Sequence, residues 1–251
     1  MAIAVVAGSA ANSAVSVSSL TLTFNTTTGQ DVYLFVTLGS TSSSVTSISN
    51  SKASGTWDVA ALATVNGTGI RMELWHLHTT GTQTSNVITV NISPSTTIAL
   101  AAEEYSGVNS TGLTVTDNNT GQEAAIRNTM TQAGSYIAGG LGFATASATT
   151  ATVQTGSTSR QSSIGVSALG EVLYDSTATA IVSLLLMTLL NASQNWVSIG
   201  VELKSGGTAT ALTDFAAVTG PALTKGIGVN GQTSQMTFAN PTVIGNYGFV
   251  S

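Results

Sequence analysis

The segment Val15-Ser-Val-Ser-Ser-Leu-Thr-Leu-Thr-Phe24 alternates apolar and polar side chains, as a strand with one buried face does. Its phase slips at Ser18-Ser19, which predicts a β-bulge there. The next segment, Asp31-Val-Tyr-Leu-Phe-Val-Thr-Leu38, is almost continuously apolar. This density predicts a central strand that is covered on both faces.

The same strand signals recur along the chain, whereas apolar residues at the helical spacing are almost absent. Thr and Val dominate these segments, and short Gly-containing turns separate them. The pattern predicts an all-β fold, an antiparallel β-sandwich of jelly-roll-like topology. Further strands are predicted at 45–49, 57–64, 70–78, 86–92, 97–105, 112–117, 135–144, 150–154, 161–168, 180–190 and 195–203.

Two apolar stretches have an alternative reading as membrane or export signals. The start, Met-Ala-Ile-Ala-Val-Val-Ala-Gly, has the small residues of a signal-peptide cleavage site but no basic region and only a short apolar run. The run 181–190 is shorter than the roughly 20 residues that cross a bilayer. A strand is the preferred interpretation of both stretches.

Charge is scarce in this chain. The 251 residues include 6 Lys and Arg and 11 Asp and Glu, giving a net charge of −5, and they include no cysteine. Soluble domains are on average about 25% charged, so we expect Ser and Thr hydroxyls or other subunits to cover the surface. The isolated basic residues argue against nucleic acid and anionic membranes as partners. The absence of cysteine excludes disulfides and zinc–thiolate sites.

The composition changes after Lys204. Ser205-Gly-Gly207 predicts a break, and the residues that follow are rich in Gly, Thr and Asn. We therefore expect a β-sandwich body over 1–204 and an extended arm over 205–251 that contacts other subunits. The residues predicted to make these contacts are Phe215, Phe238, Tyr247 and Phe249.

Few residues offer chemistry. Glu103 and Glu104 are neighbours on a predicted strand and so point to opposite faces, which prevents them from acting together as a glycosidase pair. We expect one to be solvated and the other to be hydrogen-bonded near the turn at Ser106-Gly107. His76 and His78 share one strand face, a spacing that two metal ligands can have, but the sequence shows no third ligand. We predict no catalytic residue, no metal and no cofactor.

The oxygen-rich segment 117–121 is compatible with calcium binding, but a plain turn is the preferred interpretation. Among the tryptophans, Trp75 lies on the face opposite the histidines, and Trp196 precedes an apolar strand. Both are expected in the core. Trp57 follows Gly55 in a predicted turn and is the best candidate for an exposed, sugar-stacking aromatic side chain.

Three segments together carry a resemblance to a known group. They are Met72-Glu-Leu-Trp-His-Leu-His78, Ile98-Ala-Leu-Ala-Ala-Glu-Glu-Tyr-Ser-Gly-Val108 and Asn195-Trp-Val-Ser-Ile-Gly-Val-Glu-Leu-Lys204. Their order resembles a group of virion-associated β-sandwich domains of phages and bacteria, over roughly residues 10–204. The resemblance implies a jelly-roll-like sandwich in viral particles or surface proteins, and it carries no binding or catalytic residue.

These observations favour a non-enzymatic structural subunit of a phage particle, with capsid decoration, or cementing, as its most specific form. The expected partners are further copies of the chain, in a trimer by analogy with the resemblance, and the major capsid protein or another virion protein. The alternative is a carbohydrate- or receptor-binding module of a tail fibre or cell-surface protein, with Trp57 as a contact. A glycoside hydrolase using Glu103 or Glu104 and a self-polymerising surface filament are further alternatives.

Overall fold

A computed structural model describes residues 2–13, 15–129, 131, 134–144, 150–153, 157–163, 169–177, 182–190 and 193–206. Within these ranges the chain forms antiparallel strands and no helix, so no helix there is long and apolar enough to span a membrane. The strands are β1 (Ala4–Asn12), β2 (Val17–Thr26), β3 (Asp31–Leu38), β4 (Ser44–Asn50), β5 (Ala63–Asn66), β6 (Arg71–His78), β7 (Gln83–Thr96), β8 (Ile98–Ser106), β9 (Val108–Gly121), β10 (Glu123–Thr129), β11 (Tyr136–Ala144), β12 (Thr150–Val153), β13 (Thr158–Ser163), β14 (Leu169–Thr177), β15 (Val182–Leu190) and β16 (Gln194–Ser205).

The strand order of the first half of the chain is repeated in the second half. Strands β1 to β8 form sheets of order β1-β8-β3-β6-β5 and β2-β7-β4. Adding eight to each number gives β9-β16-β11-β14-β13 and β10-β15-β12, which are the two remaining sheets. Each half is therefore a jelly-roll-like sandwich of eight strands, in which the fifth strand lies beside the sixth. The all-β, antiparallel, jelly-roll-like prediction is confirmed, but two stacked sandwiches stand where one was expected.

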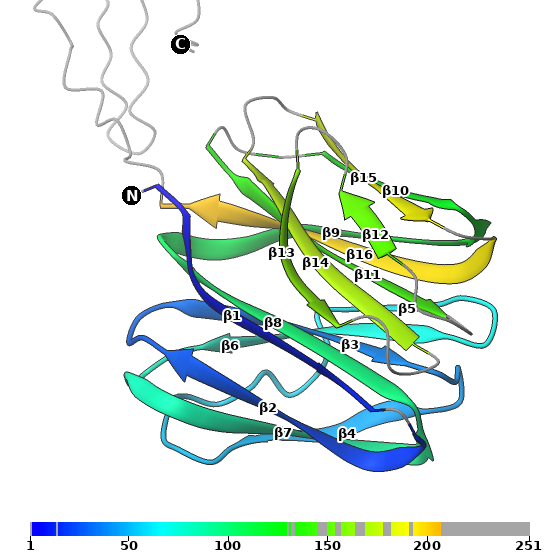
Figure 1. Cartoon of the computed structure of the whole chain (residues 1–251). Coiled ribbons are helices and arrows are strands. Elements are labelled where there is room, and N and C mark those ends of the chain that lie inside the picture. The colour runs from blue at the N-terminus through cyan, green and yellow to red at the C-terminus, as the bar shows by residue number, and fades with distance from the viewer. Residues whose placement is uncertain are drawn as a thin grey trace, which may run out of the picture. The chain divides into compact units, whose positions relative to one another are not determined.

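The four sheets are stacked in layers (Figure 1). The two five-stranded sheets form the middle layers, and a three-stranded sheet covers each of them on the outside. One core lies between β2-β7-β4 and the adjacent five-stranded sheet, with Leu34, Trp75 and Val90 in it. A second core lies between the two five-stranded sheets, with Phe35, Leu74 and Ile199 in it. β3 is consequently buried at all eight positions, as the density of its sequence predicted.

The two halves pack with a pseudo-two-fold relation. β1 lies against β13, and its counterpart β9 lies against β5. Likewise β8 lies against β14, and its counterpart β16 lies against β6. Such reciprocal pairing defines an isologous interface, in which the same surface of each unit meets the other. The chain is thus built like a covalently linked dimer of two jelly-roll-like units.

Small residues on β11 allow the middle sheets to approach each other. Gly140 on β11 and Phe35 on β3 occupy equivalent positions in the two halves. Phe35 pairs with Leu74 on β6, and Gly140 pairs with Leu173 on β14, the counterpart of β6. A Cβ added to Gly140 would lie 2.3 Å from Phe35 Cδ1. The Phe35 ring therefore fills the space that a side chain at position 140 would need, which fixes how the halves dock.

Several local predictions are confirmed and others are corrected. The pairing of β2 with β7 shifts between Val17 and Ser19, so the bulge predicted at Ser18-Ser19 is present. The strand expected over 57–64 is reduced to β5 and one isolated bridge at Trp57. β10 and β14 were not predicted, because charged residues, together with Gly170 in β14, interrupt their apolar pattern. The stretch 180–190 does contain a strand, β15.

Candidate functional site

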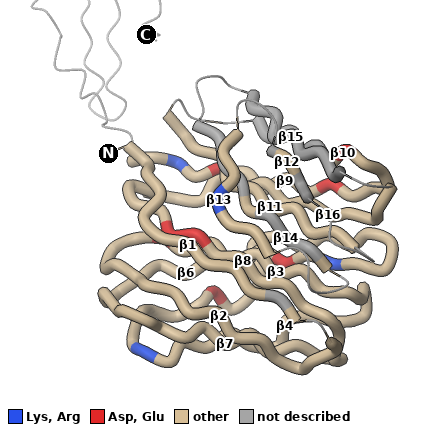
Figure 2. The backbone as a smooth tube through the Cα atoms, viewed as in Figure 1, with Lys and Arg blue, Asp and Glu red and all other residues tan. Residues whose placement is uncertain are grey.

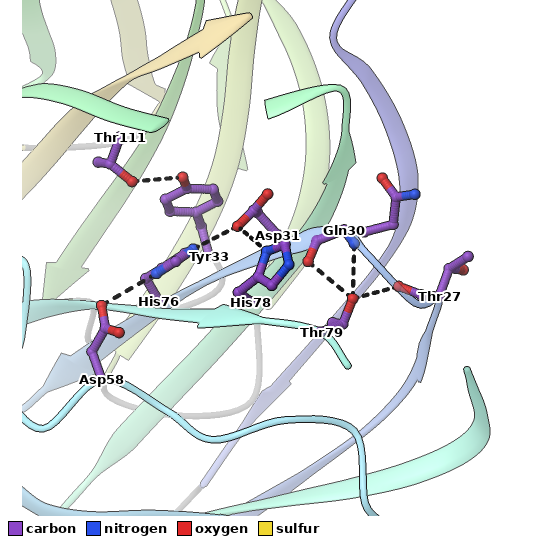
Figure 3. A network of polar contacts seen from close by, with 9 residues as sticks. All are labelled: Thr27, Gln30, Asp31, Tyr33, Asp58, His76, His78, Thr79 and Thr111. Atoms are coloured by element: carbon purple, nitrogen blue, oxygen red, sulfur yellow. Dashed lines mark hydrogen bonds and ion pairs between the residues drawn. The ribbon is translucent and has the colours of Figure 1, made fainter. Parts of the chain in front are cut away.

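Four titratable side chains gather at one end of the first five-stranded sheet (Figure 3). Asp31 begins β3 and His78 ends β6, and the strand register places these two residues opposite each other. Asp31 Oδ1 lies 2.8 Å from His76 Nε2 and 3.0 Å from His78 Nδ1. On the other side of the ring, His76 Nδ1 lies 3.2 Å from Asp58 Oδ2. The fold thus brings two aspartates that are far apart in sequence onto one imidazole.

Tyr33 connects this cluster to the second half of the chain. Its ring centroid lies 5.0 Å from that of His76, and its hydroxyl is 2.8 Å from Thr111 Oγ1 on β9. Burial raises the pKa of Tyr33 well above its ordinary range, so the phenol stays protonated. The tyrosine therefore packs against His76 as an uncharged ring, and its hydroxyl links the two sandwiches.

The pKa of His76 reflects opposing effects. Burial lowers it, but the hydrogen bond to Asp31 and the charges of Asp58 and Asp31 raise it further than burial lowers it. The net result is a pKa above the ordinary value for histidine. The geometry and the electrostatics thus both favour the protonated ring.

The prediction that His76 and His78 share a face is confirmed, and Asp31 lies between them. The sequence offered no third ligand for a metal, and Asp31 has the right chemistry to be one. However, these groups are set at hydrogen-bonding distances. Within the described parts of the chain, no group of three or more His, Asp or Glu residues is placed to hold a metal ion. The cluster is described best as a hydrogen-bonded charge network.

The carboxylates considered for catalysis have structural partners. Glu103 and Glu104 point to opposite faces of β8, as predicted, but both are buried, so the expectation that one is solvated is wrong. Glu104 accepts a hydrogen bond from the backbone N–H of Thr27 at 2.6 Å, in the β2–β3 turn rather than at Ser106-Gly107. Burial of an acid on this face is tolerated because the turn supplies a donor.

The duplication repeats this arrangement. Glu104 pairs with Val32 on β3, and Glu202 pairs with Ile137 on β11, so the two acids occupy the same position in the two halves. Glu202 Oε1 accepts the backbone N–H of Thr131 at 2.6 Å, and Oε2 accepts its hydroxyl at 2.9 Å. Each acid therefore ties the turn that follows the second strand of its half to the last strand.

The two equivalent acids differ in pKa. Burial raises the pKa of Glu104, and the hydrogen bonds from Thr27 only partly offset this effect. Burial acts on Glu202 in the same direction, but hydrogen bonds from Thr131, Ser135 and Leu113 outweigh it and leave the pKa lowered. The number of donors, rather than burial alone, decides which acid is the more readily ionised.

The tryptophans are all in the core. Trp75 and Trp196 are buried, as expected. Trp57 is only 7% exposed and its Nε1 donates to Asn50 Oδ1 at 3.0 Å, so its assignment as an exposed sugar platform is wrong. Trp57 is drawn inward because it packs in the outer core of the first half and bridges to Leu77.

Two other predicted sites have different outcomes. Residues 117–121 belong to β9 and are not a turn, and Asp117 Oδ1 accepts the N–H of Asn118 instead of facing a common centre. The proposed interface residues lie outside the described residues. They are Phe215, Phe238, Tyr247 and Phe249.

Sequence reasoning missed Asp31 and Asp58 as partners of the histidines. The only available signal was a charged residue at the start of the otherwise apolar segment 31–38, which the strand register later places opposite His78. Comparison with protein-family models, curated proteins and solved structures finds no match in any of the three. The site is therefore interpreted from its own geometry.

Proposed function

We propose that this chain is a non-enzymatic structural subunit of a phage particle, and that it decorates or cements a capsid. The observation that carries the proposal is the outer face of the sheet β2-β7-β4. Its three strands contain no Asp, Glu, Lys or Arg, and they appear without charge colours in Figure 2. Burial of such a face against a partner costs little charge desolvation.

The outward residues of this face form ranks of small polar side chains. The register aligns Ser19 with Asn91 and Ser47, and Thr21 with Thr89 and Ser49. Hydroxyl and amide groups in such ranks offer both donors and acceptors to a partner surface. A charge-free, hydrogen-bonding face suits a permanent contact better than a transient, electrostatically steered one.

Two further features support a structural role. The buried acids Glu104 and Glu202 bind turns of their own chain. The segments around 72–78, 98–108 and 195–204 resemble virion-associated domains, and this resemblance is the reason for proposing a phage particle. The carbohydrate-binding alternative loses its proposed contact, because Trp57 is buried.

The full-length chain tests the assembly part of the proposal by sedimentation velocity over a range of concentrations. We expect an oligomer, a trimer by the resemblance, and we expect Thr89→Lys in the centre of the charge-free face to dissociate it. Thr68→Lys, in the exposed β5–β6 turn, is the matched control and leaves assembly unchanged. A wild-type chain that remains monomeric, and that Thr89→Lys does not affect, contradicts the proposal.

Location is tested separately by quantitative mass spectrometry of purified particles from cultures that carry the gene. A fixed copy number relative to the major shell protein supports decoration, and absence of the chain from particles refutes it. Removal of residues 205–251 tests the arm. The proposal predicts a folded protein, with an unchanged denaturation midpoint, that no longer assembles.

A further inference from the structure

Both ring nitrogens of His76 face carboxylate oxygens that come from different parts of the chain. Nε2 faces Asp31 on β3 at 2.8 Å, and Nδ1 faces Asp58, in the connection between β4 and β5, at 3.2 Å. A neutral imidazole has one N–H, whereas the imidazolium has two, and an ionised carboxylate can only accept. Both contacts exist together only when His76 is protonated.

The Asp58 contact lies where the edge of the sheet needs cover. β5 pairs with β6 only from Arg71 to Leu74. Beyond that point, the isolated bridge between Trp57 and Leu77 and the hydrogen bond from the Asp58 N–H to the His76 carbonyl at 3.0 Å continue the pairing. Residues 57–58 therefore cover the part of the β6 edge that β5 leaves open.

We propose that His76 is a pH-operated latch that holds residues 57–58 against the edge of β6. When His76 loses a proton, the ring keeps the Asp31 hydrogen bond, which is shorter and whose carboxylate is only 9% exposed. The contact with Asp58 is lost, because a lone pair then faces a carboxylate that is 42% exposed and free to turn toward water. The latch is closed at acidic pH and opens as the pH rises.

Besides Asp58, the polar and titratable groups around His76 come from four strands. β3 contributes Asp31 and the protonated Tyr33, and β8 contributes Glu103, which is paired in register with Tyr33. β6 itself contributes His78, whose Nδ1 also faces Asp31 Oδ1 and whose side chain is 60% exposed. β9 contributes only the uncharged Thr111 hydroxyl, through Tyr33.

The sign of the effect follows from linkage. The pKa of His76 in the folded chain lies above its ordinary value. The contribution of the latch is therefore fully present below the unfolded-state pKa and disappears as the pH rises through the folded-state pKa. An open latch exposes backbone N–H and C=O groups of β6, and unpaired strand edges are sites at which another chain can add a strand. This inference does not depend on the proposed function.

Hydrogen exchange measured by NMR on the full chain tests the latch at a single amide. The protection factor of the Asp58 N–H, corrected for intrinsic exchange, should fall about two- to fivefold between about pH 5 and about pH 9, which is the scale of a partly exposed ion pair. The fall should follow the titration of His76 observed in its ring resonances. Amides between β3 and β8 serve as the internal reference and should not change.

Asp58→Asn sharpens the test, because an amide can donate to the unprotonated Nδ1 and should keep the latch closed at high pH. Asp117→Asn, a carboxylate elsewhere on the surface, is the matched control and should retain the wild-type profile. Protection that stays flat in the wild type, or that falls equally in Asp58→Asn, overturns the proposal. If Asp58→Asn does not fold, His76→Gln must give a flat profile, and a wild-type profile in that variant also overturns it.

Discussion

The two equivalent acids allow a matched test of how donors, rather than burial alone, determine the contribution of a buried carboxylate. The perturbation is Glu→Gln at position 202 or at position 104, which removes a charge and keeps the shape. Glu202 is fully buried and accepts two bonds from Thr131, at 2.6 and 2.9 Å. Bonds to a charged acceptor contribute about 1.5–3 kcal/mol, and neutral ones about 0.5–1.5 kcal/mol. With a difference of about 1 kcal/mol for each bond, Glu202→Gln should cost about 2 kcal/mol.

Glu104 Oε1 accepts the N–H of Thr27, and its Oε2 has no hydrogen-bond partner. Burial already disfavours its charged form. A neutral amide can accept from Thr27 without the desolvation cost of the charge, so Glu104→Gln should stay within about 1 kcal/mol of the wild type.

Urea unfolding at neutral pH measures both free energies, with coincident fluorescence and circular dichroism transitions as the two-state check. The pH dependence has a defined sign. The lowered pKa of Glu202 means that its contribution is present above the unfolded-state pKa and is lost as the pH falls through the folded-state value. The cost of Glu202→Gln should therefore shrink in acid. Equal costs for the two variants, or a larger cost for Glu104→Gln, would refute the reasoning.

Three further substitutions have definite expected outcomes in the same assay. Gly140→Ala should destabilise the chain by about 1–3 kcal/mol, because its Cβ meets the Phe35 ring. Adding Phe35→Leu to this variant should recover part of the loss. A double variant whose cost equals the sum of the two single costs would contradict this. Tyr33→Phe removes the hydroxyl bonded to Thr111 and should lower the free energy of unfolding by about 0.5–1.5 kcal/mol. An unchanged free energy would show that this contact does not link the halves. Trp57→Ala should cost about 3–5 kcal/mol, as expected for a core residue, whereas a change under about 1 kcal/mol would show that the side chain is exposed.

Prediction from sequence succeeded where local patterns carried the information. The alternation in 15–24 and the apolar density of 31–38 are consequences of which strand faces are buried, so the strands, the bulge at Ser18-Ser19 and the central position of β3 could be predicted. The turns that follow β2 and β6 could also be predicted, because each contains a glycine. Gly29 lies between β2 and β3 and adopts a left-handed conformation with φ of 76°, and Gly81 lies between β6 and β7.

Prediction failed where a residue depends on a distant partner. Trp57 follows a Gly-containing turn, and nothing in its neighbourhood shows that it bridges to Leu77 and packs in a core. One of Glu103 and Glu104 was expected to be solvated, yet both are buried, and the β2–β3 turn provides the donor that makes burial of Glu104 possible.

The sequence by itself determined that the chain is all-β, poor in charge and covered by small polar residues, because strand periodicity and composition are local properties. Only the tertiary structure decided that the body is two jelly-roll-like units packed around a pseudo-two-fold relation, since the halves share strand order while the residues that fill equivalent positions, such as Phe35 and Gly140, differ. The structure alone also placed Asp31 and Asp58 on either side of His76. Strand register and chain crossing set that arrangement, and no spacing along the sequence encodes it.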